Sequence, residues 1–566
     1  MFQSVVQRVC FIPELLCLIF DHLDLSSNAC NAVVCKAWSE VARDKLWWEV
    51  SGPRQLLSIL APITVAGCFE RKLEPKDWSR FMIYAPRVRK FTYADLGHVP
   101  KISTAALAEI SETRTTLSLL PRLRELTYIT AFPNQRRFAV LFMNESVRRF
   151  NFRLDDEPEP LRPFFDNIPA RMPHLTVLDL RTSRSASSIE KDLARLLSEL
   201  PCLEKVVLPL YHVTGSMLET LTKLPDIGVI EFQYLQGQGI GDKADVANFD
   251  PHIPKDGFPK LWDLSLSAHL SKLIPVLIDT LAPAAKNLTS LYLHAISVKN
   301  EASVHEYFSA VGENFPLIER IYMEALPGPI MSTQWSGAEP EFEVLTLDTL
   351  KPLFDCPHLD TFVLMYPSPL CLTLDDLETL TSRWPALEVI DLNKEPVILG
   401  SALGTRSNLS LRALLPFAKN CPNLRELGLY LDATETDLPS ASEIPRPFTK
   451  LTDLNVGISS IGEPQSVAFF LSRICPADCR VEAGERWPHV ESFVDDTSRA
   501  VLQGRISAWV EVNSYLPLSV KLRHEEKAVR DDLEREVEDL RIRNAILAEK
   551  SAMGLKGDGD RGCIIV

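Results

Sequence analysis

The chain lacks the long hydrophobic stretches that would cross a membrane. None of its 566 residues lies in an uninterrupted apolar run of 18, which is the length that indicates a spanning helix. The apolar N-terminus, residues 1–20, is interrupted by Pro13 and Glu14 and is followed by no small-residue cleavage site, so we do not expect a secretory signal. These absences predict a soluble intracellular protein, cytoplasmic or nuclear.

Basic charge is also scarce. The sequence has 60 Lys and Arg against 75 Asp and Glu, which gives a net charge of −15, and it has no basic run longer than two or three residues. An acidic chain repels phosphate backbones unless a local basic stripe overrides the total charge. We therefore expect no nucleic-acid partner.

Motifs for metals, cofactors and catalysis are missing as well. The 12 cysteines are scattered with no Cys-x-x-Cys pair, which is typical of reduced, buried cysteines rather than a metal site. His305-Glu306 lacks the second histidine of a zinc protease motif, and no Gly-x-Ser-x-Gly sequence occurs. The glycines of 237–241 are followed by Asp242 where a dinucleotide loop needs its third glycine. The sequence predicts no metal, no cofactor and no enzyme activity.

Proline, in contrast, is abundant, with 40 residues. Many of these prolines mark a repeat of the form Pro-x-apolar-x-x-apolar-x-apolar, seen clearly at 173–180, 201–208, 259–266, 385–392 and 422–429. Thirteen such units begin between Val88 and Leu451, and ten of them carry proline two residues before the first apolar position. The period is about 30 residues, the length of one structural repeat in a solenoid.

The spacing within each unit predicts a short strand followed by a helix. Apolar residues at relative positions 1, 4 and 6 suit a strand that faces a stacked core. Helical stretches such as 191–200 and 215–224 lie upstream of units, and the proline that follows ends each helix. The pattern resembles a leucine-rich-repeat solenoid over 88–456, although the Asn or Cys usual after the strand is absent. The alternative, a doubly wound α/β enzyme, would need longer apolar strands and a glycine-rich phosphate turn.

The first fifty residues carry more apolar surface than short helices can bury. Residues 11–24 form a predicted helix with Pro13 at its start and apolar side chains nearly all round. Further apolar residues follow at 31–38 and 46–48. Some 40 residues cannot bury this surface alone, which argues for a partner. The other interpretation is a helical cap for the solenoid.

This segment resembles an F-box, whose pattern includes Leu-Pro-x-Glu-Leu, Ile-Phe-x-x-Leu, Val-Cys-Lys-x-Trp and Leu-Trp. The resemblance implies docking onto the SKP-type adaptor of a cullin–RING ubiquitin ligase, while the solenoid holds a protein substrate. Carried over to this sequence, it implies that eight residues lie at or support the adaptor interface: Pro13, Leu16, Ile19, Phe20, Leu23, Cys35, Lys36 and Trp38. It further predicts that replacing Leu16 and Phe20 with Ala abolishes adaptor binding while the solenoid stays folded.

The C-terminal region is dense in charge. Within 521–550, leucines fall seven apart at 533, 540 and 547, with Val537 and Asn544 between them. This pattern predicts a weak coiled coil or a solvated helix. A glycine-rich stretch follows, and the last four residues, Cys-Ile-Ile-Val, have the form of a prenylation site. We expect a prenyl group on Cys563, which would give weak, reversible membrane attachment.

The chain is thus predicted to be an α/β protein with a three-helix F-box, an irregular leucine-rich-repeat horseshoe and a C-terminal helix. The expected segments are the F-box (1–50), a connection and cap (51–85), the solenoid (86–482), a C-terminal cap (483–520), a charged helix (521–550) and a flexible tail (551–566). We expect a substrate receptor of an SKP–cullin–F-box ligase. The alternative is a scaffold outside any ligase, held at a membrane by the lipid.

Overall fold

The computed structural model describes residues 12–98, 100–154, 160–232, 237–298, 300–325, 342–396, 409–434, 438–439, 443–444, 446–484 and 496–557. The chain divides into two compact units. The first comprises Met1–Val298 and Ala302–Glu324, and the second comprises Lys299–Glu301 and Ala325–Val566. Each unit is a repeat of strands and helices.

Three short helices open the first unit: α2 (Pro13–Asp21), α3 (Leu25–Asn31) and α4 (Lys36–Leu46). Pro13 occupies the first turn of α2, where the missing N–H costs no hydrogen bond. The Asp24 carboxylate caps α3 by accepting from the Ser27 N–H at 2.9 Å. The buried Asn28 amide donates to the carbonyls of Phe20 (3.0 Å) and Leu23 (3.3 Å) and so joins α3 to the end of α2.

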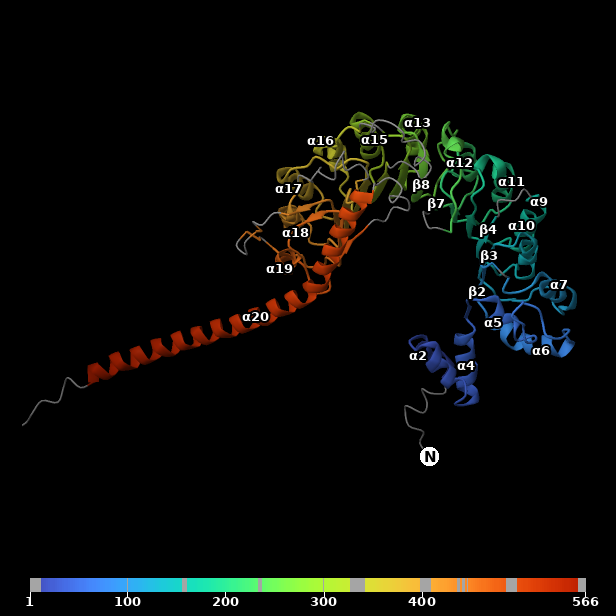
Figure 1. Ribbon diagram of the computed structural model, residues 1–566, viewed down its shortest axis with the longest axis horizontal. Coiled ribbons are helices and arrows are strands. Elements are labelled where there is room, and N and C mark those ends of the chain that lie inside the picture. The colour runs from blue at the N-terminus through green and yellow to red at the C-terminus, as the bar shows by residue number, and fades with distance from the viewer. Residues whose placement is uncertain are drawn as a thin grey trace, which may run out of the picture. The chain divides into compact units, whose positions relative to one another are not determined.

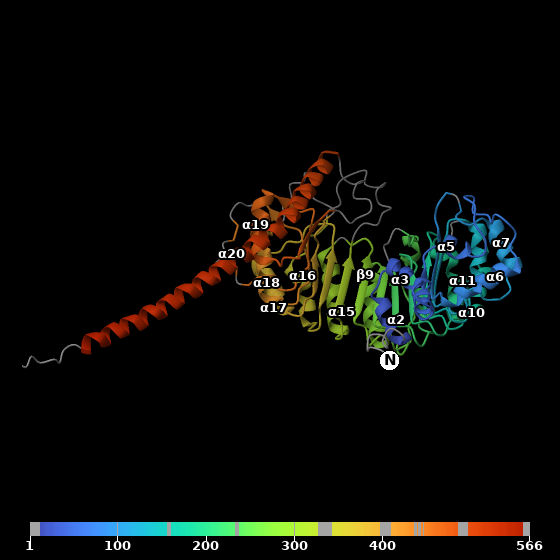
Figure 2. The ribbon, with the colours of Figure 1, turned by 90° about the horizontal axis from the view of Figure 1, so that it is seen from below.

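The strands of the first unit are parallel and follow the chain order. Their bounds are β1 (Glu49–Val50), β2 (Lys90–Asp95), β3 (Glu125–Thr130), β4 (Arg149–Arg153), β5 (Val177–Arg181), β6 (Lys205–Leu208), β7 (Val229–Phe232), β8 (Asp263–Ala268), β9 (Ser290–Ala295) and β10 (Arg320–Glu324). The register is in phase throughout, so that Phe91, Leu126, Phe150, Leu178, Val206, Ile230, Leu264, Leu291 and Ile321 form one continuous buried row. Figure 2 shows these strands side by side.

Helices return the chain from one strand to the next and lie on one face of the sheet (Figure 1). They are α5 (Pro53–Leu57), α6 (Pro75–Tyr84), α7 (Thr104–Thr113), α8 (Pro133–Arg136), α9 (Arg162–Phe165), α10 (Asn167–Arg171), α11 (Ala186–Ser198), α12 (Gly215–Leu221), α13 (Leu270–Val276), α14 (Ala282–Ala284) and α15 (Glu301–Asn314), the last from Ala302 onward in this unit. The helices predicted at 191–200 and 215–224 correspond to α11 and α12 and are confirmed.

The second unit repeats the same arrangement. Its parallel strands are β11 (Thr361–Met365), β12 (Val389–Leu392), β13 (Glu426–Leu429), β15 (Asp453–Gly457) and β17 (Arg480–Ala483), with a small pair of β14 (Asp432–Ala433) and β16 (Ser460–Ile461). The helix α16 (Leu347–Leu350) precedes β11, and α17 (Leu374–Arg383), α18 (Leu414–Asn420) and α19 (Pro464–Ile474) lie between later strands. The in-phase row of Phe362, Ile390, Leu427, Leu454 and Val481 is buried.

Each unit is therefore a solenoid of the leucine-rich-repeat type. Within the described residues of each unit, the strand order never reverses, whereas a doubly wound α/β enzyme has a reversal where its ligand binds. The predicted apolar positions face the core because the side chains of a strand alternate between its faces.

One helix, α20 (Asp496–Gly557), ends the described chain. Its first half packs on α19 and β17 through buried Leu502, Trp509, Val512, Leu516 and Val520, and the Trp509 indole donates to the Ser459 carbonyl at 3.0 Å. From residue 524 to 551 every side chain is exposed, and Figure 1 shows this half running away from α19. The predicted boundary between 520 and 521 lies inside this helix. The side chains change there from partly buried to exposed, while the backbone stays helical.

Candidate partner-binding site in the N-terminal helices

The three N-terminal helices have a small core of their own. Leu16 and Phe20 of α2 are 1% and 2% exposed and pack against Val41 and Ala42 of α4. Trp38 is half-buried beside them. Leu16, Phe20 and Trp38 are three of the residues that the F-box pattern singled out, and they lie together here as the core of the helices.

On the side of α2 away from this core, Leu18 is exposed between the acidic Glu14 and Asp21, and Ile19 is exposed beside the core. Leu18 is 62% exposed and Ile19 45% exposed. In an α-helix, residue 18 points about 200° away from residue 16, because successive residues turn by about 100°. The packing of Leu16 and Phe20 on α4 therefore turns Leu18 toward solvent, while Ile19, about 60° from Leu16 around the helix, is exposed at the edge of the packed side.

More apolar side chains of the three helices and their connections are exposed. Beyond Leu18 and Ile19, the exposed set in the three helices and their connections comprises Ile12, Leu23, Leu25, Val33 and Val34. Single exposed apolar residues are ordinary, but such a number within 35 residues is typical of an interaction site. The F-box pattern did not predict Ile12, Leu18, Leu25, Val33 or Val34; the period of α2 could have identified Leu18.

The remaining predicted residues divide between the two environments. Ile19, Leu23, Pro13 and Lys36 are exposed, while Cys35 is half-buried. Cys563 lies outside the described residues. The structure thus separates side chains that could touch a partner from those that hold the helices together.

The three helices are fixed to the start of the solenoid by charge and by aromatic packing. The Arg87 guanidinium, which precedes β2, donates to both Glu40 and Asp44 of α4. This interaction holds the pKa of Glu40 below its usual value. Next to it, the rings of Trp47 and Tyr84 lie 4.9 Å apart. These contacts attach the three helices, with their exposed apolar residues, to the segment before β2.

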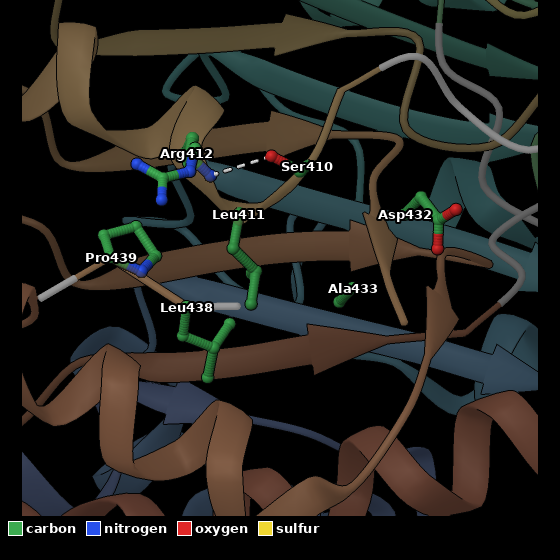
Figure 3. A pocket seen from close by; sticks show the side chains of 7 residues that line it. All are labelled: Ser410, Leu411, Arg412, Asp432, Ala433, Leu438 and Pro439. Atoms are coloured by element: carbon green, nitrogen blue, oxygen red, sulfur yellow. Dashed lines mark hydrogen bonds between the residues drawn. The ribbon is translucent and has the colours of Figure 1, made fainter. Parts of the chain in front are cut away.

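The described residues offer no grouped metal ligands, and the hollow in Figure 3 is too small for a ligand. Among the described residues, no three His, Cys, Asp or Glu side chains are grouped as metal ligands. A hollow lined by Ser410, Leu411, Arg412, Asp432, Ala433, Leu438 and Pro439 (Figure 3) leaves no room for a water-sized molecule. In the part of the chain that the structure describes, no helix has the length and apolar character needed to cross a membrane.

The known proteins similar to this chain are solved structures with low sequence identity and low TM-scores. No protein-family model matches the chain, and no curated protein matches it. Similar solved structures include the TLR13–ssRNA13 complex, with 12% identity and a TM-score of 0.36 over 73% of this chain and 52% of that chain. The internalin InlF from Listeria monocytogenes has 11% identity and a TM-score of 0.29 over 77% and 89% of the two chains. The Rad7–Elc1 complex of yeast has 14% identity and a TM-score of 0.31 over 86% and 96%.

The match to the TLR13 chain spans only about half of that chain. The repeat character of each unit rests on its own strand register and on its buried apolar row, both described above.

Proposed function

We propose that this protein is the substrate-recognition subunit of an SKP–cullin–F-box ubiquitin ligase and is not itself an enzyme. In this proposal the three N-terminal helices bind the SKP-type adaptor, and the solenoid binds a protein substrate. The observation that carries the proposal is the apolar face of α2, where Leu18 and Ile19 remain exposed beside a core built from F-box motif residues.

Burial of this face would supply the energy of adaptor binding. Burying an exposed Leu or Ile side chain contributes about 1.5–3 kcal/mol, and a few central apolar anchors dominate most protein interfaces. Lys36 at the start of α4 is exposed and can form a polar contact at the rim of such an interface.

The test is co-purification with an SKP-type adaptor. The Leu18→Asp/Ile19→Asp variant places two charges on the exposed face without entering the core, and we expect adaptor binding to fall at least tenfold. Its matched control is Leu117→Asp/Ile278→Asp, which alters two side chains of similar exposure (71% and 43%) elsewhere in the same unit. Adaptor binding that survives in the first variant, or that falls equally in the control, contradicts the proposal.

The alternative function, a scaffold outside any ligase, makes a different prediction. Reconstituted with adaptor, cullin and RING subunits, a substrate receptor supports ubiquitin transfer to a bound protein, and the transfer depends on Leu18 and Ile19. A scaffold does not support transfer.

A further inference from the structure

Three arginines occupy the same position at the beginning of three neighbouring strands. Arg89, Arg124 and Arg148 directly precede β2, β3 and β4. The Arg124 N–H donates to the Arg89 carbonyl at 2.8 Å, and the Arg148 N–H donates to the Arg124 carbonyl at 2.8 Å. Neighbouring strands lie about 4.8 Å apart, so three guanidinium groups arise from adjacent rungs of the sheet. We call this set the arginine ladder.

The ladder lines a cavity of about 540 Å³. Its walls are Arg89, Arg122, Arg124, Ser146 and Arg148, and no carboxylate or aromatic side chain is among them. The cavity therefore concentrates four positive charges in a chain whose net charge is −15.

Two of the arginines are held in place by backbone carbonyls. The Arg89 guanidinium donates to the Pro86 carbonyl at 2.7 Å and lies 5.5 Å from the centre of the Trp48 ring. The Arg148 guanidinium donates to the Glu145 carbonyl at 2.7 Å. These contacts orient the side chains without neutralising their charge.

The other two arginines carry uncompensated charge. Within the described residues, Arg122 and Arg124 form no hydrogen bond and no ion pair through their guanidinium groups. Two acidic groups beside the ladder are engaged elsewhere: Asp44 binds Arg87, and Glu125 pairs with Lys90 at 3.3 Å. Burial, followed by the positive charges of Arg122 and Arg124, lowers the pKa of Arg89.

The fold does not require arginine at this position. The next two strands carry Thr176 and Glu204 there, and their carbonyls accept the same pair of backbone hydrogen bonds. Like charges on adjacent rungs destabilise a sheet. Because the ladder works against stability and other residues fit the position, its arginines are best explained by an anionic ligand.

We propose that the arginine ladder binds a phosphorylated serine or threonine in a partner protein. A phosphate monoester carries a charge of about −1.5 to −2 and three acceptor oxygens, and guanidinium forks bind such groups through paired hydrogen bonds. A volume of about 540 Å³ leaves room for one phosphorylated side chain. The absence of aromatic rings in its walls removes the stacking that single-stranded nucleic acids use. This inference does not depend on adaptor binding.

The experiment uses the full chain, immobilised, and a pool of seven-residue peptides with a central phosphoserine and random flanks. The same pool without phosphate is the comparator. We expect at least tenfold enrichment of the phosphorylated pool, and at least a tenfold loss of that enrichment in Arg124→Gln/Arg148→Gln. The control Arg383→Gln/Arg480→Gln removes the same charge from exposed arginines of the second unit and should keep the enrichment.

A second measurement distinguishes binding from a structural role. Because the ladder is a site of repulsion, the thermal unfolding midpoint of Arg124→Gln/Arg148→Gln should equal or exceed that of the unsubstituted chain; a lower midpoint contradicts this account. Equal retention of both peptide pools overturns the proposal. So does ladder-dependent binding that is tighter to a pentaglutamate peptide, to an oligonucleotide or to vesicles containing a phosphoinositide.

Discussion

The phenyl ring of Phe20 meets the indole of Trp38 edge-on, with ring centroids 5.6 Å apart and planes inclined by 74°. This contact joins α2 to α4 inside the small core of the N-terminal helices. A substitution at Phe20 therefore disturbs the packing of this core. Loss of adaptor binding in such a variant does not show that Phe20 touches the adaptor.

We predict that Phe20→Ala unfolds the N-terminal helices and leaves the strands of the first unit intact. Truncating a buried Phe costs about 3–5 kcal/mol, which is large for a core of so few residues. Hydrogen exchange should lose protection in 12–46 and keep it in β5 to β8. Protection retained throughout 12–46 would contradict this prediction.

A Leu16→Ala/Phe20→Ala variant that loses the adaptor is consequently no proof of an interface. The comparison with Leu18→Asp/Ile19→Asp resolves this, since only the exposed pair should lose adaptor binding with its helices still protected from exchange.

The ion pair between Arg71 and Asp77 predicts a dependence of stability on pH. The Arg71 guanidinium donates to both oxygens of the buried Asp77 carboxylate at 2.7 Å and lowers the pKa of that carboxyl to about 2. Because the pKa of Asp77 is lower in the folded state than its ordinary value of 3.8, the pair stabilises the fold above about pH 4. This stabilisation is lost as the pH falls toward 2.

We expect Arg71→Gln to lower the free energy of unfolding at pH 7, because the Asp77 carboxylate then loses both hydrogen bonds from the guanidinium. Denaturant unfolding at a series of pH values measures the difference from the unsubstituted chain. That difference should be constant from pH 7 to about pH 4.5 and shrink below pH 4. A difference that grows on acidification would refute the assignment.

Gly428 of β13 leaves room for a buried ion pair. A Cβ atom at this position would lie 2.6 Å from the Asp391 carboxyl carbon, and Asp391 pairs with buried Lys394. Gly428→Ala should therefore destabilise the second unit by about 1–3 kcal/mol.

The matched control is Gly504→Ala in α20, where an added Cβ meets no atom within 4 Å. There the same change should stabilise the chain by about 0.5–1 kcal/mol, because glycine is unfavourable inside a helix. The thermal unfolding midpoints of the two variants test this prediction. Equal shifts of the midpoint in Gly428→Ala and Gly504→Ala would contradict it.

The repeat could be read from the sequence because its causes are local. In ten of the thirteen units a proline precedes the strand and stops the helix before it. Apolar residues then recur at fixed spacing, so that Leu175 and Leu178 both point into the core. For the same reason the start of α2 at Pro13 followed from the chain alone. For 521–550 the structure has a helix whose side chains are exposed from residue 524 onward, which fits both the solvated helix and the weak coiled coil that the sequence predicts.

The sequence by itself thus determined the period, the strands and the helical N-terminal segment, because each depends on residues close together in the chain. Only the tertiary structure decided which side of α2 is exposed, since the packing of α4 selects Leu16 and Phe20 from a helix with apolar residues on several sides. It also decided that Arg89, Arg124 and Arg148 share one cavity. These arginines are 24 to 59 residues apart in the chain and become neighbours only when the parallel strands pair in register. A search for consecutive basic residues therefore cannot find this cluster.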